Sequence, residues 1–402
     1  MADAIAVSNF ATFTLGMLVY FAGAALTRRH AVLREFNIPE PVVGGIFVSL
    51  LIWGFYLLTG KEIIFDLTVR DGLLVMFFTT IGLNARLSEL KRGGKALGIL
   101  LVLTVLYIVV QNVVARFGTS LFGLPEQLSI MLGSAALIGG HGTAIAWGPE
   151  LYAQFGIEQG AEVGLAAATV GLILAALIGG PIARFLIKRH DLKPDNEDAD
   201  PIVGLDYDDA GSVSLNYVGF MVTLLTINIT IFAGLFINEF IEDAGLKLPS
   251  FVPCMILGIA VANLKPIVLP RTPAVAGTPM LALISEFSLA VFLSMSLMSL
   301  QLWTLADLAG PLFVVLGIQA IVAVLFCIFV LFPAMGRNYR AAVLGAGFGG
   351  FALGATPTAI ANMTSVTKRY GPSPVAFLIL PLVSAFFVDL ANAAIIQFFL
   401  SI

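Results

Sequence analysis

Two short stretches decide the fold of this chain: GGHGTAIA at residues 139–146 and GATPTAIA at residues 354–361. Each interrupts a long apolar run, one in each half of the chain, and the shared letters TAIA recur at an offset of 215 residues (358 − 143). The same offset pairs FFTT at residues 77–80 with FLSM at residues 292–295. Apolar segments broken by glycine and proline at matching places in two halves are the best sequence indicator of the binding site of a secondary transporter.

The composition is that of a protein embedded in a lipid bilayer. Of the 402 residues, 59% are hydrophobic and only 11% are charged, against about 25% charged in a typical soluble domain. The mean hydropathy is +0.99. Apolar runs of roughly 18 residues or more, the length that crosses a bilayer as a helix, recur along most of the chain. The sequence therefore predicts an all-α polytopic membrane protein.

Charge and cysteine content exclude several other classes of protein. The net charge of −4 is spread thinly, and no basic block indicates a nucleic-acid partner. Cys254 and Cys327 both lie in apolar runs, where we expect small buried side chains, with no disulfide, no transition-metal site and no cofactor. No P-loop, zinc-protease motif or nucleophile–base set appears, so we expect no enzyme.

The apolar runs predict ten crossing helices and two broken segments. We expect helices at residues 9–27, 41–59, 71–88, 96–117, 161–187, 213–240, 250–264, 280–303, 308–335 and 372–400, with broken segments at 126–152 and 340–366. The one polar stretch is a linker at residues 188–212, which divides an N-terminal repeat (1–187) from a C-terminal repeat (213–402).

The basic residues predict how these helices are oriented. If each broken segment enters and leaves on one side, each half crosses the membrane five times, so the two repeats have inverted topology. All lysines and arginines except Lys61, Arg70, Arg116 and Lys247 then fall on one side, which the positive-inside rule assigns to the cytoplasm. Both termini are expected outside, in the periplasm, and the linker in the cytoplasm. The first apolar run precedes its arginines, so it is read as a retained helix rather than a cleaved signal.

The two broken segments are the predicted binding site. Irregular backbone is tolerated at membrane depth only where protein or a watery cavity satisfies its polar groups, so each is expected to be a re-entrant hairpin whose tip lines a site. Gly140 and Gly142 permit a turn, and Thr143 and Thr358 stand where a new helix begins. A helix N-terminus attracts anions. The alternative reading is that these glycines only permit close helix packing.

Several polar residues accompany the hairpins. Asp389 lies in an apolar stretch that we expect to be mid-helix, where an ionisable group is a functional candidate that would meet an ammonium or Na⁺, or else hydrogen-bond hairpin backbone. Asn392 is expected to share its helix face. Thr169 and Ser384 are separated by the repeat offset and offer hydroxyls. His141 is expected to be a hydrogen-bonding residue of the hairpin, with proton coupling as the alternative.

A polar stripe and one arginine remain open to two readings. The helix predicted at 71–88 carries a polar stripe formed by Thr79, Thr80 and Asn84. Serines at 294–299 occupy the corresponding place in the second half. These groups suit Na⁺, yet small polar residues also hold membrane helices together. Arg369 follows the second hairpin, where it either reaches a substrate carboxylate or, as we favour, anchors the inner face.

At these residues the chain resembles the glutamate:sodium symporter family. The resemblance covers essentially the whole chain and is carried by PEP at 39–41, TIGLN at 80–84, GGHGT at 139–143, GATPTAIANM at 354–363 and FFVD at 386–389. It implies a protein of the bacterial inner membrane that imports L-glutamate with Na⁺ as coupling ion. It also implies a homodimer in which a rigid scaffold holds two transport domains that move like elevators.

Taken together, these features predict which residues bind the ligands. The substrate-binding set is Gly140, His141, Gly142, Thr143, Thr356, Pro357, Thr358, Asn362, Ser384, Asp389 and Arg369, and the sodium-binding set is Thr79, Asn84, Thr169 and Asn392. We expect backbone N–H groups at 140–143 and 356–358 to hold the substrate carboxylates. The transport domain would comprise the two hairpins and the helices predicted at 161–187 and 372–400.

Other functions stay open at this point. The nearest is a sodium-coupled di- or tricarboxylate (citrate-like) transporter of the same architecture, which would need no group for an α-ammonium. A passive channel is less compatible with paired inverted hairpins, because channels use rings of charge or filter loops from several subunits. A membrane enzyme is the least supported class.

Overall fold

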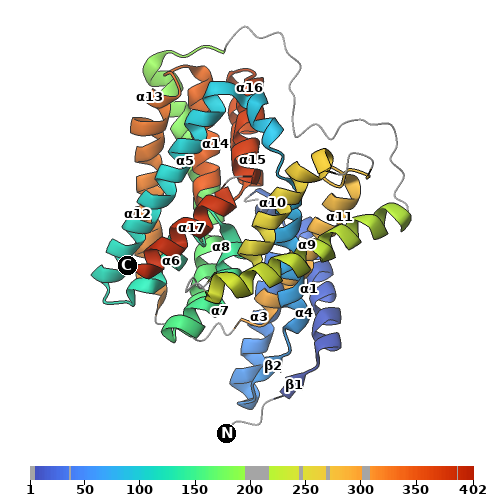
Figure 1. Ribbon diagram of the computed structural model, residues 1–402. Helices are drawn as coiled ribbons and strands as arrows, with labels where there is room; N and C mark the ends of the chain where they lie inside the picture. Colours follow the sequence, from blue (N-terminus) through green and yellow to red (C-terminus); the bar gives the residue numbers. More distant parts are fainter. Residues whose placement is uncertain are drawn as a thin grey trace. The chain divides into compact units, whose positions relative to one another are not determined.

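The structure is a computed structural model that describes residues 5–35, 38–194, 217–243, 248–268, 272–300, 308–386 and 388–402. It is helical apart from one pair of short strands (Figure 1). Most of the predicted linker, residues 188–212, lies outside the described residues; its first three residues belong to the helix before it.

The elements follow the predicted order closely. They are β1 (Ile5–Val7), α1 (Asn9–Arg29), α2 (Ala31–Glu35), α3 (Glu40–Thr59), β2 (Ile63–Phe65), α4 (Thr68–Asn84), α5 (Leu87–Leu121), η1 (Glu126–Leu128), α6 (Ser129–Leu132), α7 (Gly140–Phe155), α8 (Gly160–His190), α9 (Tyr217–Asp243), α10 (Phe251–Val268), α11 (Pro279–Met298), α12 (Ala309–Phe326), η3 (Cys327–Leu331), α13 (Phe332–Ala334), α14 (Tyr339–Leu353), α15 (Thr356–Tyr370), α16 (Pro374–Phe386) and α17 (Val388–Ser401).

The chain divides into two compact units, and each unit takes elements from both halves of the sequence. Unit 1 comprises Met1–Ala85, Gly148–Glu150 and Gly211–Ala309, and unit 2 comprises Arg86–Trp147, Leu151–Ala210 and Gly310–Ile402. Unit 1 therefore holds α1, α3 and α4 together with α9, α10 and α11. Unit 2 holds both broken segments with α5, α8, α12, α16 and α17.

The long helices have the length and hydropathy of membrane spans. In the described part of the chain, eight helices are long and apolar enough to cross a bilayer, and nine if α16 and α17 count as one broken span. The tenth predicted crossing is α4, which has 17 residues with Asp71 in its first turn. Both cysteines are free and buried, as expected.

Helices in unit 1 touch backbone to backbone at glycines. A Cβ added at Gly44 of α3 would collide with the carbonyl oxygen of Val19 in α1, and one added at Gly23 would collide with that of Glu40. On the other side of the unit, a Cβ at Gly82 of α4 would collide with the carbonyl oxygen of Met255 in α10. Lipid tails are as apolar as leucine, so such close packing replaces the hydrophobic effect as the force that joins these helices.

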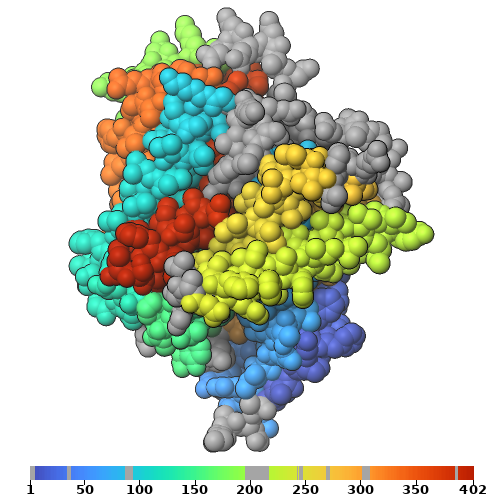
Figure 2. Space-filling model, viewed as in Figure 1, coloured from blue at the N-terminus to red at the C-terminus, as the bar shows by residue number. Residues whose placement is uncertain are grey.

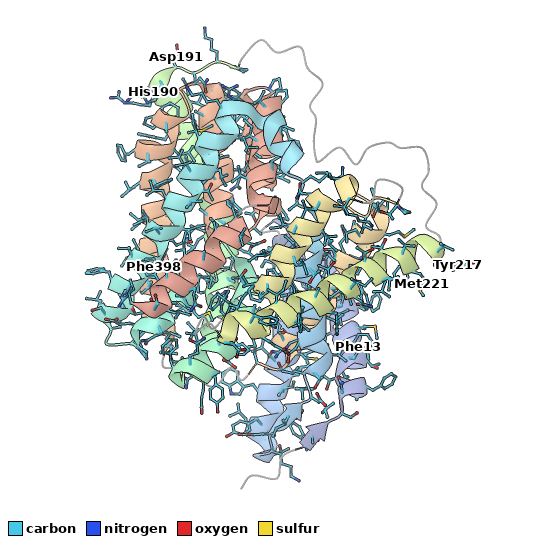
Figure 3. The ribbon with its side chains drawn as sticks, viewed as in Figure 1. Phe13, His190, Asp191, Tyr217, Met221 and Phe398 are labelled. Carbon is cyan, nitrogen blue, oxygen red and sulfur yellow. The ribbon has the colours of Figure 1, made fainter. Side chains whose placement is uncertain are left out.

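Helix α9 is the least buried span of unit 1. Figure 2 shows it extended along the surface, and Figure 3 shows Tyr217 and Met221 near its first turn. Only 22% of its apolar window is buried, and Phe232 is 77% exposed. An apolar helix of this kind fits a lipid environment, because large apolar side chains exposed along a whole helix are unfavourable in water.

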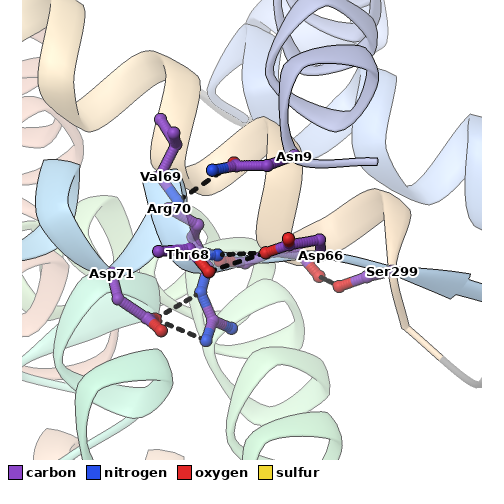
Figure 4. Close-up of polar contacts among 8 residues, drawn as sticks. Asn9, Asp66, Thr68, Val69, Arg70, Asp71 and Ser299 are labelled. Atoms are coloured by element: carbon purple, nitrogen blue, oxygen red, sulfur yellow. Dashed lines mark hydrogen bonds and ion pairs between the residues drawn. The ribbon is translucent and has the colours of Figure 1, made fainter. Parts of the chain in front are cut away.

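The start of α4 is fixed by polar contacts (Figure 4). Asp66 Oδ1 accepts hydrogen bonds from the backbone N–H of Thr68 at 3.0 Å and from its hydroxyl at 2.7 Å. These bonds hold the pKa of the Asp66 carboxyl below its ordinary value. Because the folded-state pKa is lowered, their stabilising effect is present above the ordinary pKa and is lost as pH falls through the lowered one.

The all-α prediction is confirmed, and one short pair of strands adds to it. β1 and β2 form a parallel pair in which Ile5, Ala6 and Val7 align with Ile63, Ile64 and Phe65. Both strands are only three residues long and rich in β-branched side chains, which favour extended backbone. Periodicity does not detect segments this short.

Unit 2 is built around a helical hairpin formed by α14 and α15, which lie side by side (Figure 1). A Cβ at Gly350 would meet Ala359 at 2.9 Å, and one at Gly347 would meet Met363 at 2.7 Å. Residues farther from the turn on both sides thus meet one another, so the two helices run antiparallel. The rings of Tyr107, Phe326 and Phe348 pack together and join α14 to α5 and α12.

The prediction of one continuous helix at residues 372–400 was wrong. This stretch consists of two helices, α16 and α17, and the segments 374–384 and 388–401 are bent by 45° relative to each other. Asp389 therefore lies in the first turn of α17 rather than in the middle of a helix. A carboxylate at that position is favoured by the unpaired N–H groups of the helix start, which lowers the cost of an acid in apolar surroundings.

The contact between α1 and α3 predicts a difference between two substitutions in one helix. Gly44→Ala forces α1 and α3 apart and should destabilise the protein by about 1–3 kcal/mol. Gly54→Ala, also in α3, introduces a Cβ with nothing within 4 Å and should leave stability unchanged or slightly higher. The measurement is thermal unfolding of the two purified variants, monitored by size-exclusion chromatography. Equal melting temperatures would contradict this packing.

Candidate functional site

The first break in unit 2 spans residues 133–139, between α6 and α7. Here the chain leaves helical geometry while residues 133–138 are buried, and Gly140 then opens α7 with φ +69°. Ser134 is the best-held residue of the break. Its N–H donates to Asn112 Oδ1 at 3.1 Å, its hydroxyl accepts from Asn112 Nδ2 at 2.7 Å, and its carbonyl accepts from Asn392 Nδ2 at 3.1 Å.

The second break is Gly354 and Ala355, between α14 and α15. Thr356 and Pro357 then start α15 with the proline in the first turn, where its missing N–H costs nothing. The carbonyl of Ala352, in the last turn of α14, has no helical partner ahead of it. It accepts a 2.8 Å hydrogen bond from the side chain of Gln111 in α5.

A second glutamine donates a hydrogen bond to the backbone carbonyl that precedes the first break. Gln319 of α12 donates from Nε2 to the carbonyl of Leu132, the last residue of α6, at 3.1 Å, and to the carbonyl of Gln111 at 2.8 Å. Gln111 and Gln319 are both completely buried. The sequence analysis missed this pair, although a signal was present: each is an amide in the middle of an otherwise apolar helix, and such residues usually pair with other polar groups inside the membrane.

The two helices that follow the breaks are tied to unit 2 by matching hydrogen bonds. His141 Nε2 lies 3.0 Å from Thr169 Oγ1, and Thr169 donates its own hydrogen to the Leu165 carbonyl, so His141 is the donor. Thr356 donates to Ser384 at 2.9 Å, and Ser384 donates to the Pro381 carbonyl. His141 and Thr356, like Thr169 and Ser384, are 215 residues apart (356 − 141 and 384 − 169).

The remaining predicted hairpin residues differ in what they contact. Gly142, Thr143 and Thr358 lie in the first turns of α7 and α15, and Thr358 is completely buried with no hydrogen-bond partner for its hydroxyl among the described residues. Asn362 instead donates to the carbonyls of Ala175 at 3.0 Å and Ala346 at 3.4 Å. Its amide nitrogen therefore clamps α15 onto α8 and α14.

The amide nitrogen and the amide oxygen of Asn392 have different surroundings. Its nitrogen donates to Ser134, and a Cβ on Gly139 would lie 2.8 Å from that nitrogen, so α17 touches the first break at both ends. The Asn392 oxygen Oδ1 is buried and has no hydrogen-bond partner within the described part of the chain. Asp389 precedes it by three residues and is half-buried.

Arg369 is not brought together with the second break. It lies in the last turn of α15 and Thr356 in the first, so about 20 Å of helix separates their backbones at 1.5 Å per residue. It lines a cavity with the last turns of α8 instead. This position agrees with the reading in which Arg369 anchors one face of the membrane.

Thr79 and Asn84 belong to unit 1, whereas Thr169 and Asn392 belong to unit 2. The hydroxyl of Thr79 donates to the Val75 carbonyl of its own helix at 2.7 Å, and Asn84 Oδ1 accepts from the Gly277 N–H at 2.8 Å. Thr80 donates to the Ser285 hydroxyl at 2.8 Å, which joins α4 to α11. Of the three residues in the polar stripe of α4, Thr80 is thus the one that bonds to another helix.

The hydrogen bond from Gln111 to Ala352 predicts a loss of stability on its removal. Gln111→Leu leaves the Ala352 carbonyl without its partner and should cost about 1–3 kcal/mol. Thr104→Val is the matched control, because Thr104 is equally buried in α5 but bonds only to the Leu100 carbonyl of its own helix. Thermal unfolding of the purified variants measures both. A Gln111→Leu protein as stable as Thr104→Val would show that the bond is dispensable.

The comparisons with known proteins cover almost the whole chain. The family model described as "Sodium/glutamate symporter" matches residues 5–372. The sodium/glutamate symporter of Escherichia coli is 39% identical over 399 residues, which is 98% of this chain and 97% of that protein. The sodium/glutamate symporter of Haemophilus influenzae is 39% identical over 394 residues, or 97% and 96%.

One of the solved structures similar to this chain is a sodium proton antiporter from Methanocaldococcus jannaschii. It has a TM-score of 0.44 and 12% identity, and it covers 96% of each chain. The family assignment rests instead on the match to the family model and on the identity with full-length relatives. By both measures, this chain belongs to the sodium/glutamate symporter family.

Proposed function

We propose that this protein is a symporter that carries L-glutamate across the bacterial inner membrane together with Na⁺. The observation that carries the proposal is 39% identity, over nearly the full length, to symporters named for sodium and glutamate. The fold is compatible, because at least eight helices have the length and hydropathy of membrane spans. The protein is a transporter and not an enzyme, and Na⁺ is its coupling ion rather than a bound cofactor.

The substrate carboxylates bind at the two breaks in this proposal. The first turns of α7 and α15 begin there, and N–H groups in a first turn have no partner within the helix. Each helix start is also positively polarised. The hydroxyl of Thr358, buried and free of other bonds among the described residues, adds a donor in α15. Asp389, half-buried in the first turn of α17, is the group we assign to the substrate ammonium or to a Na⁺ ion.

Sodium is assigned to oxygen atoms near the first break. Na⁺ is a hard cation and prefers oxygen ligands, and Asn392 Oδ1 is a buried oxygen with no other partner in the described residues. Asn392 already holds Ser134 through its nitrogen. A cation on Oδ1 would therefore tighten the break at the moment the substrate carboxylate is bound. Thr169 is the second proposed ligand in unit 2, while Thr79 and Asn84 remain candidates in unit 1.

Alternating access is proposed to occur by movement of unit 2 as an elevator. Unit 2 contains both breaks and every residue that fixes them, so a rigid displacement would carry the whole site. Unit 1, with its helices packed at glycines, is the proposed scaffold and homodimer contact. The matched bonds of His141 and Thr356 support two inverted repeats with re-entrant hairpins. The distribution of lysine and arginine supports both termini in the periplasm and the linker in the cytoplasm.

The first experiment is uptake of radiolabelled L-glutamate into proteoliposomes with and without an inward Na⁺ gradient. Accumulation should require the gradient, and excess unlabelled L-glutamate should abolish it. Excess citrate should leave it unchanged, because a citrate site has no need for an ammonium partner such as Asp389. Equal accumulation without Na⁺, or inhibition by citrate in place of glutamate, would contradict the proposed substrate and coupling ion.

Asp389→Asn should abolish Na⁺-driven uptake, since the variant loses the charge that meets an ammonium or Na⁺, while the protein stays folded and inserted. Phe398→Leu is the matched control in the same helix, because Phe398 is 57% exposed (Figure 3). It should transport normally. Normal uptake by the Asp389→Asn protein would remove Asp389 from the site.

A further inference from the structure

A cavity lined by positive charge lies in unit 2, apart from the breaks. Its volume is about 720 Å³, within the roughly 300–1,000 Å³ of small-molecule sites. It is formed where the last turns of α8 meet the last turns of α15. Four cationic side chains line it: Arg184, Lys188, Arg189 and Arg369. Among the described residues, no aspartate or glutamate lines it, and the ion pairs recorded there involve none of the four.

The positive charges around this cavity are more numerous than the dipole of one helix end explains. Basic residues in a last turn are favoured by the helix dipole, which accounts for Lys188 and Arg189 at the end of α8 and for Arg369 at the end of α15, but not for Arg184. Arg184 lies one turn before Lys188 on the same helix, and Arg369 comes from a different helix. Four like charges converging on one cavity repel one another unless an anion binds among them. The cavity is therefore complementary to a ligand with more than one negative charge.

The substrate proposed above fits this cavity poorly. L-Glutamate carries an ammonium beside its two carboxylates, and the lining formed by the described residues contains no carboxylate to meet it. Phosphate groups have no such requirement, and arginine side chains bind them with paired hydrogen bonds. The lining also includes the apolar side chains of Phe185 and Val366, and Phe185 is 51% exposed. Charge and apolar surface together match an amphiphile.

The length of α8 places the cavity at the level of lipid headgroups. This helix has 31 residues, about 46 Å at 1.5 Å per residue, whereas the hydrocarbon core is about 30 Å thick. Arg184, Lys188 and Arg189 lie in its last seven residues, and His190 and Asp191 mark its end (Figure 3). The positive-inside rule assigns this end to the cytoplasmic leaflet, and basic pockets between helices at that level suit anionic headgroups.

We propose that this cavity binds the phosphate groups of an anionic phospholipid, with the two phosphates of a diphosphatidylglycerol matching its four cations best. The acyl chains would lie along Phe185 on the outer surface of α8. Because α8 and α15 both belong to unit 2, the lipid would be attached to the proposed moving unit. The inference does not rest on glutamate as substrate.

The test is native mass spectrometry of the intact full-length protein titrated with diphosphatidylglycerol, phosphatidylglycerol or zwitterionic phosphatidylethanolamine. The wild type should bind the first most tightly and the last least. The double variant R184Q/K188Q should bind diphosphatidylglycerol on the order of tenfold more weakly, because two charges that face the headgroup are removed. Arg369→Gln, a single change on the other helix, should weaken binding in the same direction. Lys95→Gln is the control, an exposed lysine of α5 that does not line the cavity.

Competition separates the possible sources of the anion. Pyrophosphate or L-glutamate added at millimolar concentration should not displace the lipid. If pyrophosphate displaces it, the cavity serves a free phosphate compound, and if L-glutamate displaces it, the cavity belongs to the substrate path; either result overturns the lipid assignment. Equal lipid affinity of wild type, R184Q/K188Q and Arg369→Gln would overturn the proposal altogether, as would a failure to distinguish diphosphatidylglycerol from phosphatidylethanolamine.

Discussion

The structure of unit 2 depends on one constraint: helical backbone that is interrupted in an apolar interior must find internal hydrogen-bond partners. At the two breaks described above, buried amide side chains supply such partners. Gln111 of α5 holds the carbonyl before the second break, and Gln319 of α12 holds the carbonyl before the first. Asn112 and Asn392 hold Ser134 within the first break. Since Gln111, Gln319 and Asn392 each bond to backbone more than 180 residues away in sequence, the breaks and the surrounding helices form one connected polar network.

This network explains why a site can exist at the breaks. Helix starts bind anions only if they are held in place, and a flexible tip would lose much of its binding free energy to ordering. The bonds of His141 to Thr169 and of Thr356 to Ser384 fix the first turns that follow the breaks. Oxygens left without partners within the described residues, such as Asn392 Oδ1, are then available to a cation. Rigidity of unit 2 and availability of ligands therefore come from the same residues.

Much of this arrangement could be predicted from sequence, because the relevant signals are local. Hydropathy located the helices, glycine and proline located both breaks, and the repeat offset paired Thr169 with Ser384. The glutamine pair was missed because its partners are main-chain carbonyls more than 180 residues away, and side-chain chemistry alone does not name such partners. Asn362 was expected to bind substrate, but its amide nitrogen packs α15 against α8. The start of α17 at Val388 was missed because no glycine or proline between residues 384 and 388 marks a break.

The measurement that tests the central claim most directly is hydrogen exchange of the intact protein, followed by mass spectrometry, with Gln319→Leu and Gln111→Leu compared with wild type. The claim assigns each glutamine to one break. Exchange in Gln319→Leu should accelerate in peptides covering residues 130–139, and exchange in Gln111→Leu should accelerate in peptides covering residues 350–356. Exchange that is unchanged at both breaks, or that rises uniformly across unit 2 in either variant, would contradict the claim that these two amides hold the interrupted backbone.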